Sequence, residues 1–117
     1  MRYLLLICDD EKRMASLPAD ELDRRHAAWN AYGAELGAAG KIVGGERLRP
    51  VADATTVRQA NGRTLLADGP FAETKEQLGG YFLIEAADLD EAVTWASKMP
   101  HLPGGGSVEI RPIWPMM

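Results

Sequence analysis

Apolar residues occupy both alternating sets of positions over residues 3–8. Side chains alternate between the two faces of a β-strand, so this segment predicts a strand whose two faces are both covered. We expect helices on one face and a second sheet on the other. The acidic residues Asp9, Asp10 and Glu11 then end the strand.

The next segment has the spacing of one helix, from about residue 18 to about residue 39. Pro18 has a fixed φ that suits a helix start, and Asp20 adds negative charge where the helix dipole favours it. The predicted apolar face consists of Leu22, His26, Trp29, Gly33 and Leu36. Gly40 follows at the position that commonly closes a helix.

A second strand is predicted to begin at Ile42, with Gly44 and Gly45 inside it. Adjacent glycines in a strand indicate either a β-bulge or a place where a ligand or another backbone approaches closely. Further on, two β-rich arms, residues 55–59 and 63–67, flank an Asn-Gly pair, which predicts a hairpin with a two-residue turn.

The rest of the chain predicts one polar helical turn at residues 73–76, then a strand, a helix and a strand. Residues 81–87 and 108–112 have strand patterns. The helix begins at Asp88, ends at Pro100 and has a predicted buried face of Leu89, Ala92, Ala96 and Met99. Glycines 104–106 indicate a flexible loop, with His101 exposed beside it.

This order is that of an α+β, ferredoxin-like βαββαβ fold with an inserted β-hairpin. Two helices can cover only one face of such a sheet. The doubly apolar first strand therefore predicts that a second copy covers the other face, giving a homodimer. Trp29, Trp95 and Trp114 are expected to anchor the core or the interface.

The chain has 117 residues, 46% hydrophobic and 26% charged, as expected for a single compact domain. The formal net charge is −4 and the 13 basic residues are scattered, which argues against a nucleic-acid partner. The longest apolar run is too short to cross a membrane and lacks the pattern of a signal peptide, so we expect a cytoplasmic protein. The single cysteine, Cys8, is expected to be a buried structural thiol.

Asp68, Gly69 and Pro70 form a turn after the hairpin and give the first candidate for chemistry. Gly69 permits a positive φ and Pro70 fixes its own φ, so the corner is expected to be rigid. Asp68 could cap the amides of this turn. Alternatively, partly desolvated beside Phe71, it could act as a general acid or base. Phe71 is itself predicted to contact a bound ligand.

His26 is the second candidate, because its titratable ring lies on an otherwise apolar helix face. It could carry protons near neutral pH, or it could be a core histidine that bonds a backbone carbonyl. Arg47 follows Gly44 and Gly45 closely. It could clamp the carboxylate or phosphate of a ligand that approaches these glycines, or it could form a surface ion pair.

The sequence predicts no metal site and no organic cofactor. Its two histidines, one cysteine and dispersed carboxylates do not have the spacing of a zinc, EF-hand or facial-triad site. Nucleophile elbows, Walker loops and dinucleotide fingerprints do not occur.

Residues 68–80, DGPFAETKEQLGG, resemble the signature of the DGPF group within the YCII-related proteins. The likeness continues through residues 81–85, 88–92 and 108–112 and covers most of the chain. It implies a dimeric α+β barrel assembly. YCII-related proteins have been proposed to use a histidine and aspartate pair with the histidine on the first helix, which would give these roles to His26 and Asp68.

The sequence and the resemblance lead to two hypotheses about function. In the first, each subunit binds a small organic molecule, and Asp68, with or without His26, moves a proton in a lyase or isomerase type of reaction. The resemblance implies this through a dehydrochlorinase and muconolactone isomerases that work without an organic cofactor. In the second, the domain is a non-catalytic binding or regulatory module, and the resemblance implies a link to extracytoplasmic-function sigma factors. Convergence of Asp68 and His26 on an enclosed site would favour the first.

Overall fold

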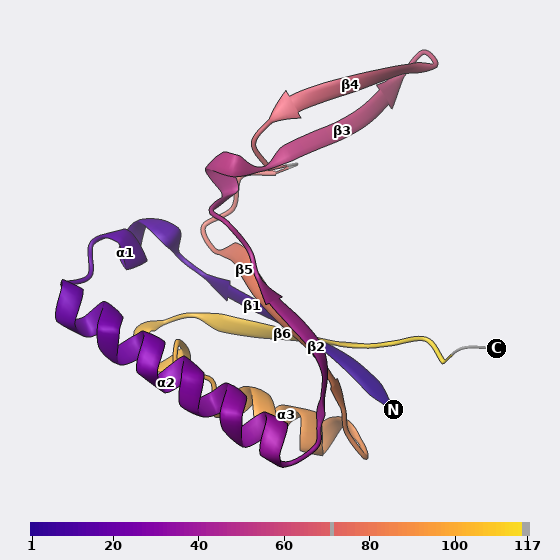
Figure 1. Cartoon of the computed structure of the whole chain (residues 1–117). Coiled ribbons are helices and arrows are strands. Elements are labelled where there is room, and N and C mark those ends of the chain that lie inside the picture. The colour runs from indigo at the N-terminus through magenta and orange to yellow at the C-terminus, as the bar shows by residue number, and fades with distance from the viewer. Residues whose placement is uncertain (71, 116–117) are drawn as a thin grey trace.

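The computed structural model describes residues 1–70 and 72–115 (Figure 1). In chain order the elements are β1 (Arg2–Asp9), α1 (Glu11–Ala15), α2 (Ala19–Ala38), β2 (Ile42–Arg47), β3 (Thr55–Ala60), β4 (Arg63–Asp68), β5 (Gln77–Glu85), α3 (Leu89–Ser97) and β6 (Ser107–Pro112). Short 3-10 helices lie at Val51–Asp53 and Leu102–Gly104. Phe71, predicted to belong to a ligand site, lies outside the described residues.

Four strands form an antiparallel sheet in the order β2-β5-β1-β6. Both β1 and β2 run antiparallel to β5, which lies between them. Strands β1 and β2 are therefore parallel and joined by α2, and β5, α3 and β6 complete the pattern. This confirms the predicted ferredoxin-like α+β fold. The register of β2 shifts between Ile42 and Gly44, directly before the glycine pair, which agrees with the bulge that was one of the two interpretations of these glycines.

Helices α2 and α3 lie on the same face of the sheet (Figure 1). The core between them and the sheet contains Tyr3, Leu5, Tyr32, Leu36, Ile84, Ala86, Ala92 and Met99, with Trp29 and Trp95 packed against it. The Tyr32 hydroxyl donates to the backbone carbonyl of Trp95 at 2.8 Å. Burial, and to a smaller extent Glu35, raises the pKa of Tyr32 to about 12. The phenol therefore stays a donor at neutral pH and ties α2 to α3.

Strands β3 and β4 form a separate hairpin that projects away from the sheet (Figure 1). Its turn lies at the predicted Asn61 and Gly62, which both have positive φ. At the other end Gly69 has a φ of +97°, as predicted. The Gly69 amide donates to the carbonyl of Ala54 at 2.7 Å, which closes the base of the hairpin.

Helix α1 was not predicted. It has no buried residue, so no apolar spacing marks it in the sequence. Instead, the Asp10 side chain caps its first turn by accepting hydrogen bonds from the amides of Lys12 and Arg13.

Three predictions near β5 and α3 were wrong. Residues 73–76 form no helical turn, and β5 begins at Gln77 rather than at residue 81. The strand continues through its glycines because Gly80 pairs with both Ile7 and Arg47 on the neighbouring strands. Leu89 is 52% exposed rather than buried, since it is the first residue of α3 and precedes the turn that packs on the core.

Alternation along β1 directs Leu4, Leu6 and Cys8 to the sheet face opposite the helices, where their side chains remain partly exposed. Burial, followed by the charges of Glu76 and Glu109, raises the pKa of Cys8. The thiol therefore stays protonated at neutral pH and is a poor nucleophile.

The C-terminal tryptophan, Trp114, is 92% exposed and does not belong to the core.

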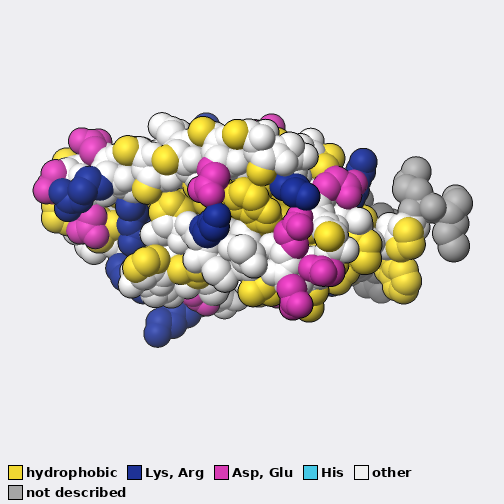
Figure 2. Space-filling model, turned by 90° about the horizontal axis from the view of Figure 1, so that it is seen from below, with side chains coloured by type: hydrophobic (Ala, Val, Ile, Leu, Met, Phe, Trp, Pro, Cys, Tyr) yellow, Lys and Arg dark blue, Asp and Glu magenta, His cyan; other side chains and the backbone are white. Residues whose placement is uncertain are grey.

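On the helix-bearing side, basic and acidic side chains are interspersed (Figure 2). Among the described residues no helix has the length and hydrophobicity needed to cross a membrane.

Candidate functional site

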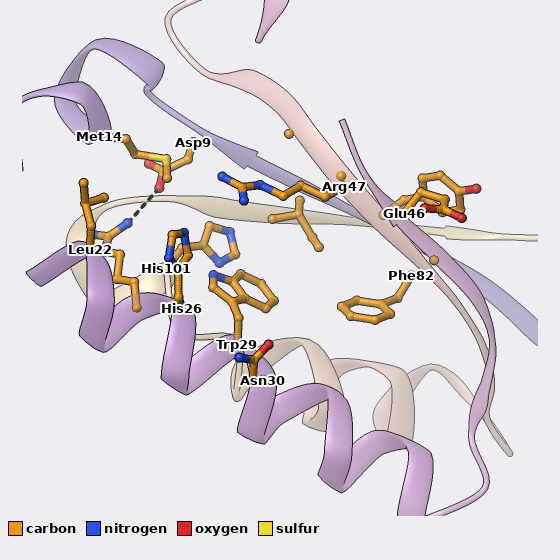
Figure 3. Close-up of a pocket in the computed structure, with 16 residues that line it drawn as sticks. Asp9, Met14, Leu22, His26, Trp29, Asn30, Glu46, Arg47, Phe82 and His101 are labelled. Atoms are coloured by element: carbon orange, nitrogen blue, oxygen red, sulfur yellow. Dashed lines mark hydrogen bonds and ion pairs between the residues drawn. The ribbon is translucent and has the colours of Figure 1, made fainter. Parts of the chain in front are cut away.

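A cavity of about 620 Å³ lies between α2 and the sheet (Figure 3). Its apolar wall is formed by Ile7, Met14, Leu22, Trp29 and Phe82, and its polar side chains include Asp9, Arg25, His26, Asn30, Arg47 and His101. The ring centroid of Trp29 lies 5.4 Å from that of His101 and 6.5 Å from that of Phe82. Aromatic rings thus form a continuous wall beside groups that can carry protons or bind anions.

Asp9, the last residue of β1, is 7% exposed and holds two arginines at one end of the cavity. Its Oδ2 accepts a hydrogen bond from Arg25 Nη1 at 3.2 Å. Its Oδ1 accepts from Arg13 Nη2 and from the amide of Asp10. Both oxygens are engaged, so the carboxylate positions Arg25 in the cavity wall.

Sequence reasoning missed this ion cluster, because Asp9 was interpreted only as the end of a strand. The available signal was a carboxylate directly after a buried strand, where burial demands a charged partner.

His26 and Arg47 enter the cavity from opposite sides, His26 from α2 and Arg47 from the end of β2 (Figure 3). The His26 side chain is exposed and has no hydrogen bond within the described part of the chain, unlike the core histidine considered as its alternative role. Arg47 likewise has no ion-pair partner among the described residues. Gly45 also lines the cavity, whereas Gly44 does not. The catalytic role of His26 and the ligand-binding roles of Arg47, Gly44 and Gly45 remain predictions.

Asp68 does not line this cavity. It is the last residue of β4, exposed at the base of the hairpin and paired with Thr55. Within one chain, the structure therefore does not bring Asp68 to the cavity that His26 lines. Its role as an acid or base remains a prediction.

His101 was expected to be exposed, but it is 2% exposed. After Pro100 the chain turns back through a 3-10 helix, and the Gly106 amide bonds the carbonyl of His101 at 3.2 Å. The ring is thereby enclosed, with Nε2 2.8 Å from the carbonyl oxygen of Ser107. The supposedly flexible glycine loop is thus the structure that covers this histidine. A glycine run gives no sequence signal for such packing.

Across residues 1–70 and 72–115, no three side chains of His, Cys, Asp or Glu gather in a way that could hold a metal ion. Among the residues that line the cavity, the histidine rings can transfer protons and the arginine guanidinium groups can bind anions.

Residues 1–117 match the YCII-related domain. The chain belongs to the YCII-related family. An uncharacterized protein of Rhizobium meliloti (strain 1021) is 40% identical over 114 residues, which cover 97% of this chain and 92% of that protein.

Among solved structures, this YCII-related chain is similar to 5-chloro-2-hydroxyhydroquinone dehydrochlorinase of Burkholderia phenoliruptrix in complex with 2,5-dihydroxybenzoquinone. The TM-score is 0.51 at 18% identity, over 97% of this chain and 94% of that one. This likeness concerns the fold, which agrees with the ferredoxin-like arrangement of the sheet and helices.

Proposed function

We propose that this YCII-related protein binds a small organic molecule in the cavity between α2 and the sheet and moves a proton on it without an organic cofactor. The observation that carries the proposal is the imidazole of His26, which lines the cavity beside a wall of aromatic rings and has no hydrogen bond to any other described residue. A histidine ring gives and takes protons near neutral pH, and an apolar wall holds a substrate close to it.

In this scheme His26 removes a proton from a carbon of the bound molecule. In a lyase-type step, the electron pair of that C–H bond forms a double bond and a leaving group departs with its own bonding pair. In an isomerase-type step, the imidazolium returns the proton at another position. Asp9 and Arg25, which are already bonded to each other, would position the substrate rather than exchange its proton.

The solved neighbour supports this proposal by analogy, since its name describes an enzyme and its structure contains a small cyclic molecule. Shared fold does not by itself carry activity from one protein to another. The sigma-factor link rests on the sequence resemblance alone and is not part of the proposal.

The test begins with the small molecule that the purified protein retains, identified by mass spectrometry. We expect the protein to exchange a C–H proton of that molecule for deuterium in D₂O, or to convert it. His26→Gln should slow this reaction by about a hundredfold or more, because it removes the group that carries the proton. The protein should stay folded, since the His26 side chain is exposed.

Asp68→Asn is the informative companion variant. If Asp68 only caps its turn, exchange should proceed at the parent rate. A comparable loss in both variants, with no further loss when they are combined, would indicate that the two residues act as a unit. Full exchange activity in His26→Gln would refute the proposal and leave a non-catalytic binding module.

We further propose that the protein is a homodimer, joined through the sheet face opposite the helices. Leu4, Leu6, Tyr81 and Leu83 alternate onto this face and are partly exposed in the single chain. Burying such a stripe removes apolar surface from water. Light scattering should give about twice the monomer mass of 12.8 kDa. A monodisperse monomer at micromolar concentration would exclude the dimer.

A further inference from the structure

Two arginines, Arg25 and Arg47, and two carboxylate residues, Asp9 and Glu46, line the cavity, although the protein as a whole is acidic, with a net charge of −4. At one end of the cavity the carboxylate of Asp9 offsets positive charge, because it forms ion pairs with Arg13 and Arg25. Arg47 has no acidic partner among the described residues. The neighbouring residue, Glu46, also lines the cavity, but its carboxylate points away from the guanidinium of Arg47 (Figure 3). An unpaired guanidinium beside an apolar wall favours an anionic ligand.

His101 adds a second feature. The carbonyl of Ser107 can only accept a hydrogen bond, so Nε2 of His101 carries the proton of that contact. In the neutral ring Nδ1 is then an acceptor. This atom is buried and has no hydrogen-bond partner within the described part of the molecule.

The loop around Gly106 covers one edge of the buried His101 ring. A Cβ at Gly106 would lie 2.3 Å from Cδ2 and 3.1 Å from Cγ, so the loop covers that edge. The edge with Nδ1 and Cε1 lies on the other side of a ring that lines the cavity and faces Trp29. A buried acceptor without a partner is costly, and a ligand that donates to it removes this cost.

Building on the proposed function, we propose that the cavity selects a small, flat organic anion that carries a hydroxyl group. The negative group of the ligand pairs with Arg47, its hydroxyl donates to Nδ1 of His101, and its plane lies against Trp29. Each requirement comes from a different element: β2, the segment after α3, and α2.

Simple aromatic acids test this selectivity without any reaction taking place. Binding of 3- and 4-hydroxybenzoate to the full chain is compared, by NMR titration, with binding of the matching methoxybenzoates and of the neutral hydroxybenzamides. The better hydroxybenzoate should bind at least about tenfold more tightly than its methoxy and its amide counterparts.

Two variants separate the two contacts. In His101→Gln the side-chain amide can still donate to Ser107 but has no atom at the position of Nδ1, so the hydroxyl preference should fall to within about twofold while the preference for the anion remains. In Arg47→Gln the anion preference should fall about tenfold while the hydroxyl preference remains. Arg49→Gln is the matched control, because Arg49 is paired with Asp53 at 3.0 Å and its side chain is 86% exposed.

The inference is overturned if the parent protein shows neither preference, if His101→Gln keeps the hydroxyl preference, or if Arg47→Gln keeps the anion preference. Should His101→Gln fail to fold, the comparisons in the parent and in Arg47→Gln still decide the matter. These results are independent of the His26→Gln exchange experiment. Selective binding without proton exchange would leave an anion-binding site with no catalytic role.

Discussion

Replacing Asp9 with asparagine is expected to lower the free energy of unfolding by about 3 kcal/mol, because it leaves buried arginine charge without its counter-ion. The Asp9 side chain is 9% exposed and that of its partner Arg25 is 13% exposed. Asparagine keeps the shape and one acceptor oxygen but loses the negative charge that both arginines share. Urea denaturation followed by circular dichroism measures the loss.

Asp20→Asn is the matched control for this substitution. Asp20 also pairs with an arginine four residues along, but the side chains of Asp20 and Arg24 are 73% and 70% exposed. Water already solvates such a pair, so the control should lose no more than about 0.5 kcal/mol. Equal losses in the two variants would show that burial does not govern the strength of the Asp9 cluster.

Gly45→Ala is expected to cost about 2 kcal/mol, because a Cβ at this position would overlap the adjacent strand. It would lie 2.8 Å from the backbone oxygen of Tyr81 and 2.8 Å from Cδ1 of Phe82. The aromatic ring can rotate, but the backbone oxygen is fixed by the pairing of β2 with β5. Thermal and urea unfolding should both report the loss.

Gly44→Ala provides the internal comparison, since a Cβ placed there would have no atom within 4 Å among the described residues, its two chain neighbours aside. The substitution should be close to neutral or slightly stabilising, because alanine has less freedom to lose in the unfolded chain. If both alanine variants were equally unstable, the cause would lie in the bulge that they share and not in the close approach at Gly45.

Local patterns were sufficient to predict the elements that form the fold. The apolar alternation of β1, the helical spacing that includes Trp29 and Leu36, and the Asp88 cap of α3 all act between neighbours in the chain. The Asn61-Gly62 turn likewise depends on two residues that accept positive φ. Such signals gave the element order and therefore the ferredoxin-like fold.

The sequence pattern also predicted some of the residues that line the cavity. His26, Gly45 and Arg47 were chosen for their places on a helix face and in a glycine-opened strand, and all three line it. Those positions follow from periodicity, because a residue on the apolar face of α2 or on the inner face of β2 must point into the space between helix and sheet.

The sequence by itself therefore determined the four sheet strands, the hairpin and the two long helices, and their order, since these depend on contacts within a few residues. Tertiary structure alone decided the composition of the site. Asp9 pairs with Arg25, which lies 16 residues away in the sequence. His101 is enclosed by a loop whose glycines gave no apolar signal. The tertiary structure also decided the direction of the hairpin, which keeps Asp68 away from the cavity of its own chain. Charge pairing and enclosure depend on which distant segments meet, and periodicity does not contain that information.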